Sequence, residues 1–447
     1  MRVPRPAARI TAFFTLILYN PKVPSADRMT RVRWWILALV FLATTINYLD
    51  RIVFSVLIPV IRQDLHLNDE QYGYVNGAFL IAYTAGFLVM GKLIDRFGTR
   101  IGYAVAITWW SLAACFHALA RTSLDLSFWR AMLGLGEAGN FPAAIKSVAE
   151  WFPKKDRAFA TGIFNAGTNV ASMVGPPMFA WMVLHYSWRF CFLITGGLGF
   201  VWLALWLVLY HLPERHPRIS RAELAYIQSD PEFETDKNIR SVPWSVALQH
   251  RETWGFVLAK FITDPVWWFY LYWLPPYLYD VRKFNLKEIG WALPVVYLMA
   301  DIGSVGGGWI SGALIRRGWP VGKARKTAMA ICAACMPVAA MCVLAKSPVL
   351  AIALVSLATS AHQGWSANLF TTTSDVFPKQ AVASVTGLGG CAGGLGGFLF
   401  SAVIPGIVVT HFGYTPVFLT MGAFHLTALI LVHFLLGDMR RISVETN

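Results

Sequence analysis

The chain has 447 residues, of which 56% are hydrophobic and 14% are charged, and its mean hydropathy is +0.52. This composition excludes a soluble globular protein of the same length and indicates a polytopic membrane protein. The formal net charge of +14 does not indicate a nucleic-acid partner, because the basic residues lie in short loops between apolar segments and alternate in density from loop to loop.

The first 28 residues differ from the rest of the chain. Prolines and arginines precede an apolar run at 10–19 that is too short to span a bilayer. A signal peptide is one interpretation, but no small-residue cleavage site follows the run. We predict an unstructured N-terminal extension at 1–28, with Met29 as an alternative start.

Twelve apolar segments follow, each compatible with the roughly 20 residues that cross the hydrocarbon core of a bilayer. One long hydrophilic stretch, 212–252, divides them into an N-terminal six-helix bundle (29–211) and a C-terminal one (253–437), before a tail at 438–447. We therefore predict an all-α membrane protein with twelve transmembrane helices at 34–60, 71–93, 100–120, 124–149, 158–182, 188–211, 253–279, 288–314, 324–345, 348–374, 381–406 and 412–437.

Lys and Arg are distributed unevenly between two sets of loops. The set that includes both termini and the 212–252 linker holds most of them, whereas the opposite set holds seven, at positions 62, 121, 189, 282, 283, 287 and 346. Because Lys and Arg are enriched in cytoplasmic loops, we predict that both termini and the linker are cytoplasmic.

The two bundles repeat a sequence pattern at an offset of 225 to 226 residues. The matching positions are Glu150, Phe152, Pro153, Lys154, Ala158, Thr161 and Gly162 with Asp375, Phe377, Pro378, Lys379, Ala383, Thr386 and Gly387, and His185, Phe192, Leu193 and Gly196 with His411, Phe418, Leu419 and Gly422. Parallel six-helix repeats place a substrate site near the midplane between the halves, where rocking exposes it to each side in turn. The repeat therefore indicates a transporter.

We predict no cofactor and no metal site. The six cysteines lie inside apolar spans, so disulfides are not expected, and Cys332 and Cys335 have no second cysteine pair or histidine nearby to complete a metal site. The chain also contains no Walker A sequence, HExxH sequence or nucleophile constellation. We therefore expect neither an ATP-driven pump nor an enzyme.

The fourth predicted span contains an arginine and a glutamate. Arg130 and Glu137 are two helical turns apart, which puts them on one face at about 10 Å, and Asn140 continues that face. Small residues around them allow a neighbouring helix to approach closely, so this face should point into the bundle. Lys146, near the end of the span, is expected to extend to the membrane surface. Burying a charge at bilayer depth costs roughly 2.5 to 3.5 kcal/mol on insertion scales, which indicates a functional face.

A motif of glycines and charged residues follows the second span. It consists of Gly91, Asp95, Arg96, Gly98 and Arg100, with a weaker echo at 308–318. Together with the sequence RAMLG at 130–134, it resembles the loop signature of the major facilitator superfamily. The resemblance implies a gating role, in which these residues form a cytoplasmic latch that stabilises the outward-facing state. The alternative is that the charges only fix the topology, and the two roles are compatible.

Further motifs are similar to the anion:cation symporter family, which includes sugar-acid permeases and the sialin and vesicular glutamate carriers. They are NYLDR at 47–51, Glu137, EWFP at 150–153 with Arg157, and Phe164 with Asn165; segments at 260–265, 284–289, 300–303, 361–363 and 374–377 are similar to bacterial hexuronate permeases. The likeness covers 34–437 and implies proton-coupled import of a sugar acid. Asp50 stands directly before the first-span arginine, and this acid implies a coupling chemistry closer to that of the galactonate-type branch of the family.

Ionisable residues within the spans are the candidate charges of a site. Arg51, Arg130 and Lys260 are candidates for holding a substrate carboxylate, which a guanidinium can bind with two hydrogen bonds. Lys260 and Asp264 are spaced i, i+4, so they can instead pair with each other. Asp301 stands among glycines and is assigned to gating or helix packing, with substrate contact as the alternative.

A sugar acid also needs polar partners for its hydroxyl groups and an apolar wall for its ring. His362 is one candidate, with a packing role beside Gln363 as the alternative. The other candidate substrate contacts are Tyr48, Tyr83, Asn165, Asn169, Gln363, Trp365 and Asn368.

Glu137, with Asp50 as its partner, is the predicted proton carrier. A coupling carboxylate must be desolvated in one conformation and paired with a cation in another, and Arg130 and Arg51 offer such a cation. The alternative is a permanent salt bridge between Glu137 and Arg51.

These observations predict a monomeric secondary active transporter of the bacterial inner membrane. Its expected substrates are protons and a hexuronate such as glucuronate or galacturonate. The alternatives are another organic anion, namely a galactonate-type aldonate, a dicarboxylate, an aromatic acid or an amino-acid-like anion, and a ligand sensor that does not transport. A sensor would need a signalling domain, and neither the linker nor the tail is long enough to form one.

Overall fold

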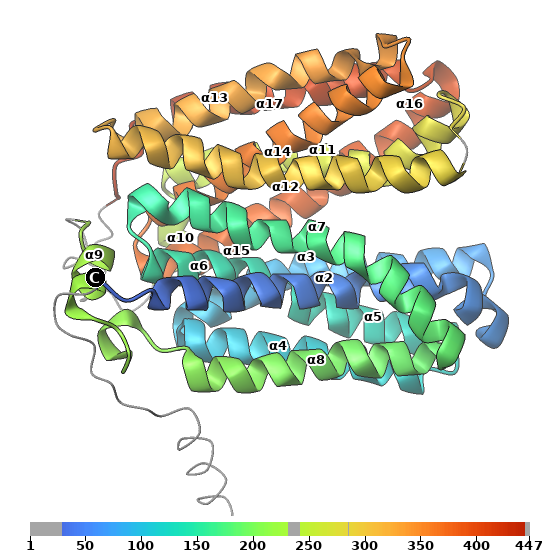
Figure 1. The fold of residues 1–447 in the computed structure, drawn as a ribbon, viewed down its shortest axis with the longest axis horizontal. Coiled ribbons are helices and arrows are strands. Elements are labelled where there is room, and N and C mark those ends of the chain that lie inside the picture. Colours follow the sequence, from blue (N-terminus) through green and yellow to red (C-terminus); the bar gives the residue numbers. More distant parts are fainter. Residues whose placement is uncertain (1–28, 231–241, 285, 443–447) are drawn as a thin grey trace, which may run out of the picture.

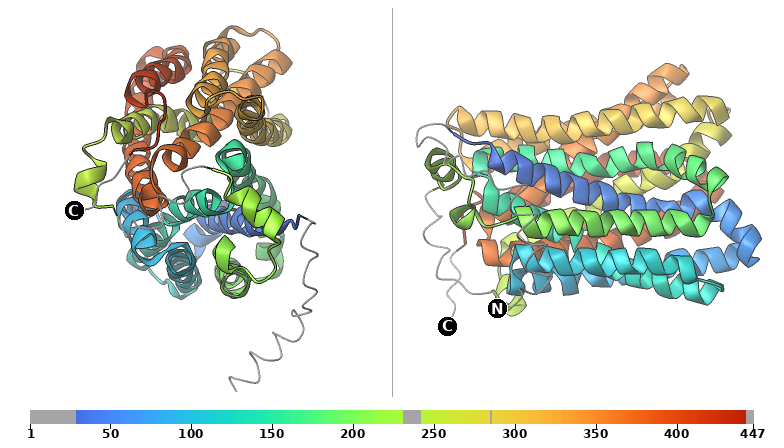
Figure 2. Two further views of the ribbon diagram at one scale, coloured as in Figure 1. Left: turned by 90° about the vertical axis from the view of Figure 1, so that its left-hand side faces the viewer. Right: turned by 60° about the horizontal axis from the view of Figure 1, so that its bottom comes forward.

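The computed structural model describes residues 29–230, 242–284 and 286–442, and the regular elements in these ranges are all helices (Figure 1). The long helices form two bundles, which lie side by side when viewed along the helix axes (Figure 2). The linker helices α9 (Arg221–Ile227) and α10 (Trp244–Ala247) lie at one end, which we call the linker side; the opposite end is the far side. The predicted extension 1–28 lies outside the described residues.

Each bundle contains six spans. The N-terminal bundle (the N-half) has α2 (Val32–Leu65), α3 (Asp69–Phe97), α4 (Thr99–Phe116), α5 (Ser123–Glu137) with α6 (Asn140–Trp151), α7 (Lys154–His185) and α8 (Trp188–Leu209). The C-terminal bundle (the C-half) has α11 (Arg251–Asp280), α12 (Leu286–Arg316), α13 (Val321–Ala340), α14 (Pro348–Val376), α15 (Lys379–Gly397), which continues through the π-helix η5 (Phe398–Val403) into α16 (Ile404–Phe412), and α17 (Thr415–Leu435). The predicted twelve-helix fold is confirmed.

Eight helices of the described ranges are long and apolar enough to cross a membrane. The other four spans are formed by α5 with α6, α7, α11 and α14. These four carry buried polar side chains, among them Arg130, Asn165, Lys260 and His362. The spans with the weakest apolar signal are therefore those that contribute most to the candidate site.

The fourth span is interrupted, although one continuous helix is predicted there. α5 ends at Glu137 and α6 begins at Asn140. Pro142 has no backbone N–H, so it cannot close the hydrogen bond to the preceding turn. Asn140 then faces the interior of the N-half, where it accepts a hydrogen bond from the Tyr103 hydroxyl at 2.6 Å. Its Nδ2 donates to Thr44 Oγ1 of α2 at 3.2 Å, and Arg51 of the same helix pairs with Glu137, so Asn140 and Glu137 both face α2 inside the N-half.

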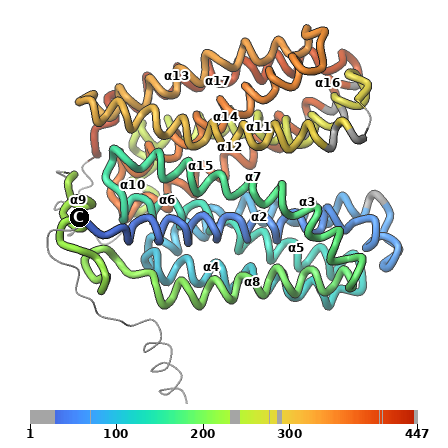
Figure 3. The backbone as a smooth tube through the Cα atoms, viewed as in Figure 1, coloured from blue at the N-terminus to red at the C-terminus, as the bar shows by residue number. Residues whose placement is uncertain are grey.

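The halves meet along two helix pairs, α3 with α15 and α7 with α12. Glycines allow this approach: a Cβ on Gly91 would lie 2.6 Å from the carbonyl oxygen of Ala383, and one on Gly162 would lie 2.3 Å from that of Ser304. Any larger residue would push the backbones apart. Towards the far side, α7 turns away from α12 (Figure 3). The halves are therefore closed on the linker side and diverge on the far side.

The linker is attached to the N-half through α9. Glu223 accepts hydrogen bonds from the backbone N–H groups of Val32 and Arg33 at 3.0 and 3.2 Å, an arrangement that the dipole of α2 favours. The Tyr226 hydroxyl donates to Asp156 at 2.7 Å. Burial and the neighbouring Asp156 carboxylate raise the pKa of Tyr226 to about 12, so its hydroxyl keeps the proton that this bond needs at neutral pH.

Candidate functional site

A cavity lies between the two halves. Residues from both bundles line it, as expected for a site on the axis between parallel repeats. They are Tyr48, Leu80, Tyr83, Phe87, Phe141, Asn165 and Thr168 of the N-half, and Lys260, Asp264, Trp267, Trp268, His362, Gln363, Ser366, Phe370, Gly390 and Gly394 of the C-half. Seven of the predicted substrate contacts are among them: Tyr48, Tyr83, Asn165, Lys260, Asp264, His362 and Gln363.

Arg51 lies behind the N-half wall of the cavity. Its guanidinium carbon is 4.5 Å from the ring centre of Tyr48 and 4.3 Å from that of Tyr83, two residues that line the cavity. Its Nε donates to Glu137 Oε2 at 2.9 Å, and its Nη1 has no hydrogen-bond partner among the described residues. Arg51 therefore keeps one donor nitrogen for a ligand, screened from the cavity by two tyrosine rings.

Glu137 is fully buried and has one cationic partner. Its Oε1 has no hydrogen-bond partner among the described residues. Arg130, on the same helix, instead donates to the carbonyl oxygen of Arg51 at 3.3 Å and packs against the rings of Phe54 and Phe79. Arg130 thus supports Arg51 and does not line the cavity.

Asp50 lies on the side of α2 that faces α8. It is fully buried, its side chain is turned towards Thr195, and neither carboxylate oxygen has a hydrogen-bond partner within 3.5 Å among the described residues. Asp50 is not hydrogen-bonded to Glu137, its predicted partner. The reason is the helical geometry of α2, since Asp50 and Arg51 are successive residues and point in different directions.

The C-half wall carries a second ion pair. Lys260 Nζ lies 2.7 Å from Asp264 Oδ2, and the ammonium stands 3.9 Å from the ring centre of Phe370. The expected i, i+4 pairing therefore occurs, and both residues also line the cavity. A Cβ on Gly393 of α15 would lie 2.0 Å from Asp264 Oδ2, so only glycine leaves room for this carboxylate.

A chain of hydrogen bonds crosses between the halves at the wall of the cavity. The Ser304 hydroxyl donates to the carbonyl of Gly162 at 3.1 Å, and Asn165 Nδ2 donates to Ser304 Oγ at 3.2 Å and to Gln363 Oε1 at 2.7 Å. Because a carbonyl can only accept, it sets the direction of the whole chain. Gln363 therefore keeps its NH₂ group, and Asn165 its carbonyl oxygen, for a ligand.

Besides Arg51 and Arg130, three more predicted contacts lie outside the cavity lining. Asn169 donates to Asp301 Oδ1 at 2.6 Å and so links α7 to α12. Asn368 donates to the carbonyl oxygen of Gly307 at 2.9 Å, and Trp365 is buried inside the C-half. These side chains hold helices together where the sequence predicts substrate contacts, because the rotation of each helix is set by its packing. Asp301 lies in this contact between the halves and outside the cavity lining, and its predicted gating or packing role stays a prediction.

The motif after the second span contacts the opposite half. Asp95 accepts hydrogen bonds from the backbone N–H groups of Ala383 and Ser384 in α15, at 3.3 and 2.6 Å. Lys146 pairs with Asp95 at 2.7 Å, so it does not extend to the membrane surface as expected. Arg96 is exposed, and Arg100 donates to the carbonyl oxygen of Leu207 within the N-half. Gly91 permits the close approach described above, and Gly98 has a φ of +80° at the junction of α3 and α4.

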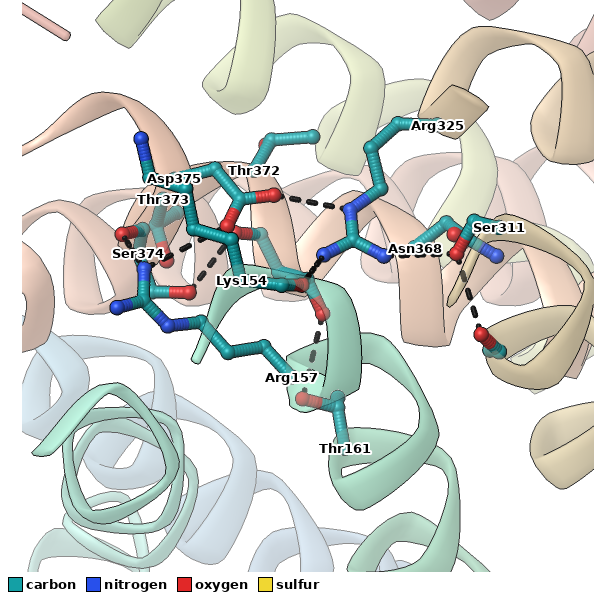
Figure 4. Close-up of polar contacts among 12 residues, drawn as sticks. Lys154, Arg157, Thr161, Ser311, Arg325, Asn368, Thr372, Thr373, Ser374 and Asp375 are labelled. Carbon is teal, nitrogen blue, oxygen red and sulfur yellow. Dashed lines mark hydrogen bonds and ion pairs between the residues drawn. The ribbon is translucent and has the colours of Figure 1, made fainter. Parts of the chain in front are cut away.

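A second cross-half cluster surrounds Asp375 on the linker side (Figure 4). Arg325 Nε donates to its carboxylate at 2.9 Å, and Arg157 of the N-half lies 3.5 Å from the other carboxylate oxygen. Arg325 also donates to the carbonyl oxygen of Lys154 at 2.6 Å, while Arg157 donates to that of Ser374 at 2.5 Å. Two guanidinium groups thus join the halves around one buried carboxylate.

Four residues in or near the site were not identified from the sequence. Arg325 lies 225 residues after Arg100, so the repeat offset could have identified it. Ser304, which orients the amide chain, carries no sequence signal, and neither does Trp267 in the cavity wall. His425 lies in the middle of the apolar last span, which also contains His433 near its end, and could have been added to the buried ionisable residues.

Two six-helix bundles around a central polar cavity define a membrane transporter. Comparisons agree with this class: the family model of the Major Facilitator Superfamily matches residues 40–401. A solved structure, the proton:xylose symporter XylE bound to 6-bromo-6-deoxy-D-glucose, has a TM-score of 0.70 at 14% identity and covers 89% of this chain and 94% of that one, which supports the fold alone.

Relatives with closer sequences are also transporters. The hexuronate transporter of Escherichia coli (strain K12) is 32% identical over 416 residues, which are 92% of this chain and 96% of that protein. The galacturonate transporter of Dickeya chrysanthemi is 34% identical over 281 residues, which are 62% of this chain and 81% of that protein. The chain belongs to the major facilitator superfamily. It is therefore a multi-pass membrane transporter and not an enzyme, as predicted.

Proposed function

We propose that this transporter imports a sugar acid anion, a hexuronate such as glucuronate or galacturonate, together with protons across the bacterial inner membrane. The similarity to hexuronate and galacturonate transporters supports the substrate class. The observation that carries the proposal is the composition of the cavity wall, in which a buried ammonium and two indole rings of the C-half face one space together with two oriented amides, one from each half.

In this proposal Lys260 and Arg51 hold the substrate carboxylate from opposite walls. Each cation has one acidic partner, Asp264 and Glu137, so the anion competes with those carboxylates for its binding. Arg51 Nη1 is the unpaired donor, and it reaches the anion once the ring of Tyr48 or Tyr83 moves aside. The guanidinium then forms the two parallel hydrogen bonds that it favours with carboxylates.

The hydroxyl groups of the sugar acid meet the oriented amides. The Gln363 NH₂ group donates to a hydroxyl oxygen, and the Asn165 carbonyl oxygen accepts from another hydroxyl. Trp267 and Trp268 offer flat apolar surfaces to the sugar ring. Both amides belong to the hydrogen-bond chain that joins α7 to α12 and α14, so the substrate contacts residues that keep the halves together.

Proton coupling follows from the buried pair of Arg51 and Glu137. When the substrate carboxylate draws the Arg51 guanidinium away from Glu137, the glutamate loses its only ion-pair partner among the described residues, and a proton must neutralise it. When the substrate leaves, Arg51 returns to Glu137 and the proton is released. Substrate and proton therefore bind together. Asp50, a buried carboxylate with no cationic partner among the described residues, is the candidate for a second proton site.

Alternating access uses the two cross-half clusters. In the state described here the halves are joined on the linker side by Asp95 and by Asp375 with its two arginines. We assign the linker side to the cytoplasm from the distribution of Lys and Arg, which makes this state outward-facing. Opening towards the cytoplasm breaks these contacts and the amide chain at Asn165.

Uptake into proteoliposomes tests the proposed substrate. Purified protein is reconstituted, a pH gradient is imposed, and uptake of labelled glucuronate is measured with an excess of unlabelled galacturonate, galactonate, a dicarboxylate, an aromatic acid or an amino acid. We expect uptake that depends on the gradient and is inhibited by galacturonate. Inhibition by galactonate alone would support a galactonate-type aldonate as the substrate, the alternative that the position of Asp50 before Arg51 favours. Binding of an acid without uptake would support a sensor.

A further inference from the structure

Two histidines form a buried pair in the C-half that the proposed mechanism does not use. His362 of α14 lines the cavity, and its Nδ1 lies 3.2 Å from Nε2 of His425 on α17. His425 is fully buried and does not line the cavity. The ring of Trp267 stacks on His362 at an interplanar angle of 13°, and Trp365 packs edge-on against His425 at 79°. The two imidazoles are thus held in place by indoles.

A hydrogen bond between these nitrogens needs one proton, and there are two arrangements of neutral rings that supply it. In the first, His425 Nε2–H donates to His362 Nδ1, so each ring carries its proton on Nε2. In the second, His362 Nδ1–H donates to His425 Nε2, so each ring carries its proton on Nδ1. The pair therefore has either two Nε2–H rings or two Nδ1–H rings.

The far nitrogen of His425 distinguishes the two arrangements. His425 Nδ1 is buried and has no hydrogen-bond partner among the described residues. The second arrangement would leave a buried N–H without an acceptor, whereas the first leaves only an unpaired lone pair. Orphaned buried N–H groups are the rarer of the two in proteins. The geometry therefore favours the arrangement in which both rings carry Nε2–H.

We propose that His425 is a positioning residue that holds His362 in the Nε2–H form, so that the cavity wall presents a hydrogen-bond donor to the anion beside Lys260. The proposal deepens the proposed function and rests on it for the identity of the ligand. The ionisable groups around His362 are Lys260 and Asp264 of α11, Tyr297 of α12, which faces Trp267, and His425 of α17. Two donors of different strength, an ammonium and an imidazole N–H, then suit an oxyanion or a hydroxyl oxygen.

The direct test is the tautomeric state, which needs no substrate. Protein labelled with ¹⁵N-histidine is reconstituted, and the ring nitrogen shifts of the pair are assigned from the signals that change in His425→Gln and in His362→Gln. We expect both rings to show the neutral Nε2–H pattern. Two Nδ1–H rings, or a rapid average of the two forms, would overturn the proposal whatever the substrate proves to be.

Transport kinetics provide the second test. His425→Phe keeps an aromatic ring against Trp365 but removes the donor, whereas His425→Gln keeps an N–H. We expect the KM for glucuronate to rise about fivefold in His425→Phe, a change that corresponds to the loss of one hydrogen bond. The change in His425→Gln should be much smaller. His425→Phe should add nothing in a His362→Gln background. Equal KM changes in the Phe and Gln variants would overturn the positioning role, while absence of glucuronate uptake by the parent protein would reject the proposed substrate alone.

Discussion

The contact of Asp95 with α15 offers a sharp test of alternating access. Asp95 accepts hydrogen bonds from the N–H groups of Ala383 and Ser384 in the other half, and it pairs with Lys146 in its own half. Only the first two contacts are lost when the linker side opens. The substitution Asp95→Asn removes the charge and leaves a single acceptor oxygen for them.

The expected magnitude follows from these contacts. Hydrogen bonds to charged groups contribute about 1.5 to 3 kcal/mol and neutral ones about 0.5 to 1.5 kcal/mol. Losing one cross-half bond, or converting a charged bond into a neutral one, should therefore destabilise the closed linker side by about 1 to 3 kcal/mol relative to the open one. The ratio of open to closed protein would then rise by about 5- to 150-fold.

A cysteine at Thr371 measures this ratio. Thr371 is fully buried and its hydroxyl lies 3.3 Å from that of Thr161 across the interface, so a reagent reaches it only when the linker side opens. The cysteine is introduced into a protein without the six native cysteines, and maleimide is supplied from the linker side. The cysteine at position 371 should then be labelled about 5- to 150-fold faster in Asp95→Asn than in the parent protein. Lys146→Met is the matched control, since it removes the ion pair but keeps both cross-half bonds. Equal rates in Asp95→Asn and its parent would refute the latch and leave Asp95 as a residue that fixes topology.

Three further predictions concern the cavity and the interface. Arg51→Lys keeps the charge but not the paired donors, so the KM for glucuronate in uptake assays should rise about tenfold; an unchanged KM would remove Arg51 from the binding site. Gly162→Ala would put a Cβ 2.3 Å from the Ser304 carbonyl oxygen and should abolish transport, whereas Gly197→Ala, with no atom within 4 Å, should transport normally; activity in both variants would contradict the close approach of α7 and α12. Asp375→Asn leaves two buried arginines without their carboxylate and should cost about 3 to 5 kcal/mol, seen as a lower Tm in detergent; Asp438→Asn, in an exposed pair with Arg440, should barely change the Tm, and equal effects would show that the Asp375 cluster is not stabilising.

The fold could be predicted from the sequence because three independent features of the sequence indicate the same architecture. Twelve apolar segments, one hydrophilic linker and a repeat at a fixed offset all indicate two six-helix bundles. The interruption between Glu137 and Asn140 was not predicted, although Pro142 is its cause and is visible in the sequence. A single proline in an apolar span is a weak signal, since membrane helices tolerate proline more often than soluble ones do.

The candidate site was only partly predictable. A polar or charged side chain in an apolar span marks the site in general, and this basis predicts Tyr48, Lys260 and Gln363, which line the cavity. The side of the helix that faces the cavity depends on how all twelve helices pack, so Asn368 and Trp365 were assigned to a cavity that they do not line. Side-chain partners depend on the same packing, which is why the pairing of His362 with His425 has no sequence signature.

The central claim is that Glu137 takes up a proton when the substrate displaces Arg51. Glu137→Gln imitates the protonated acid, and the decisive measurement compares two activities of this variant in proteoliposomes. Glucuronate accumulation driven by a pH gradient should be lost, while exchange of internal for external glucuronate should persist at a rate close to that of the parent protein. Retained accumulation, or loss of both activities in a folded variant, would contradict the claim and make the pair of Glu137 and Arg51 a permanent structural salt bridge.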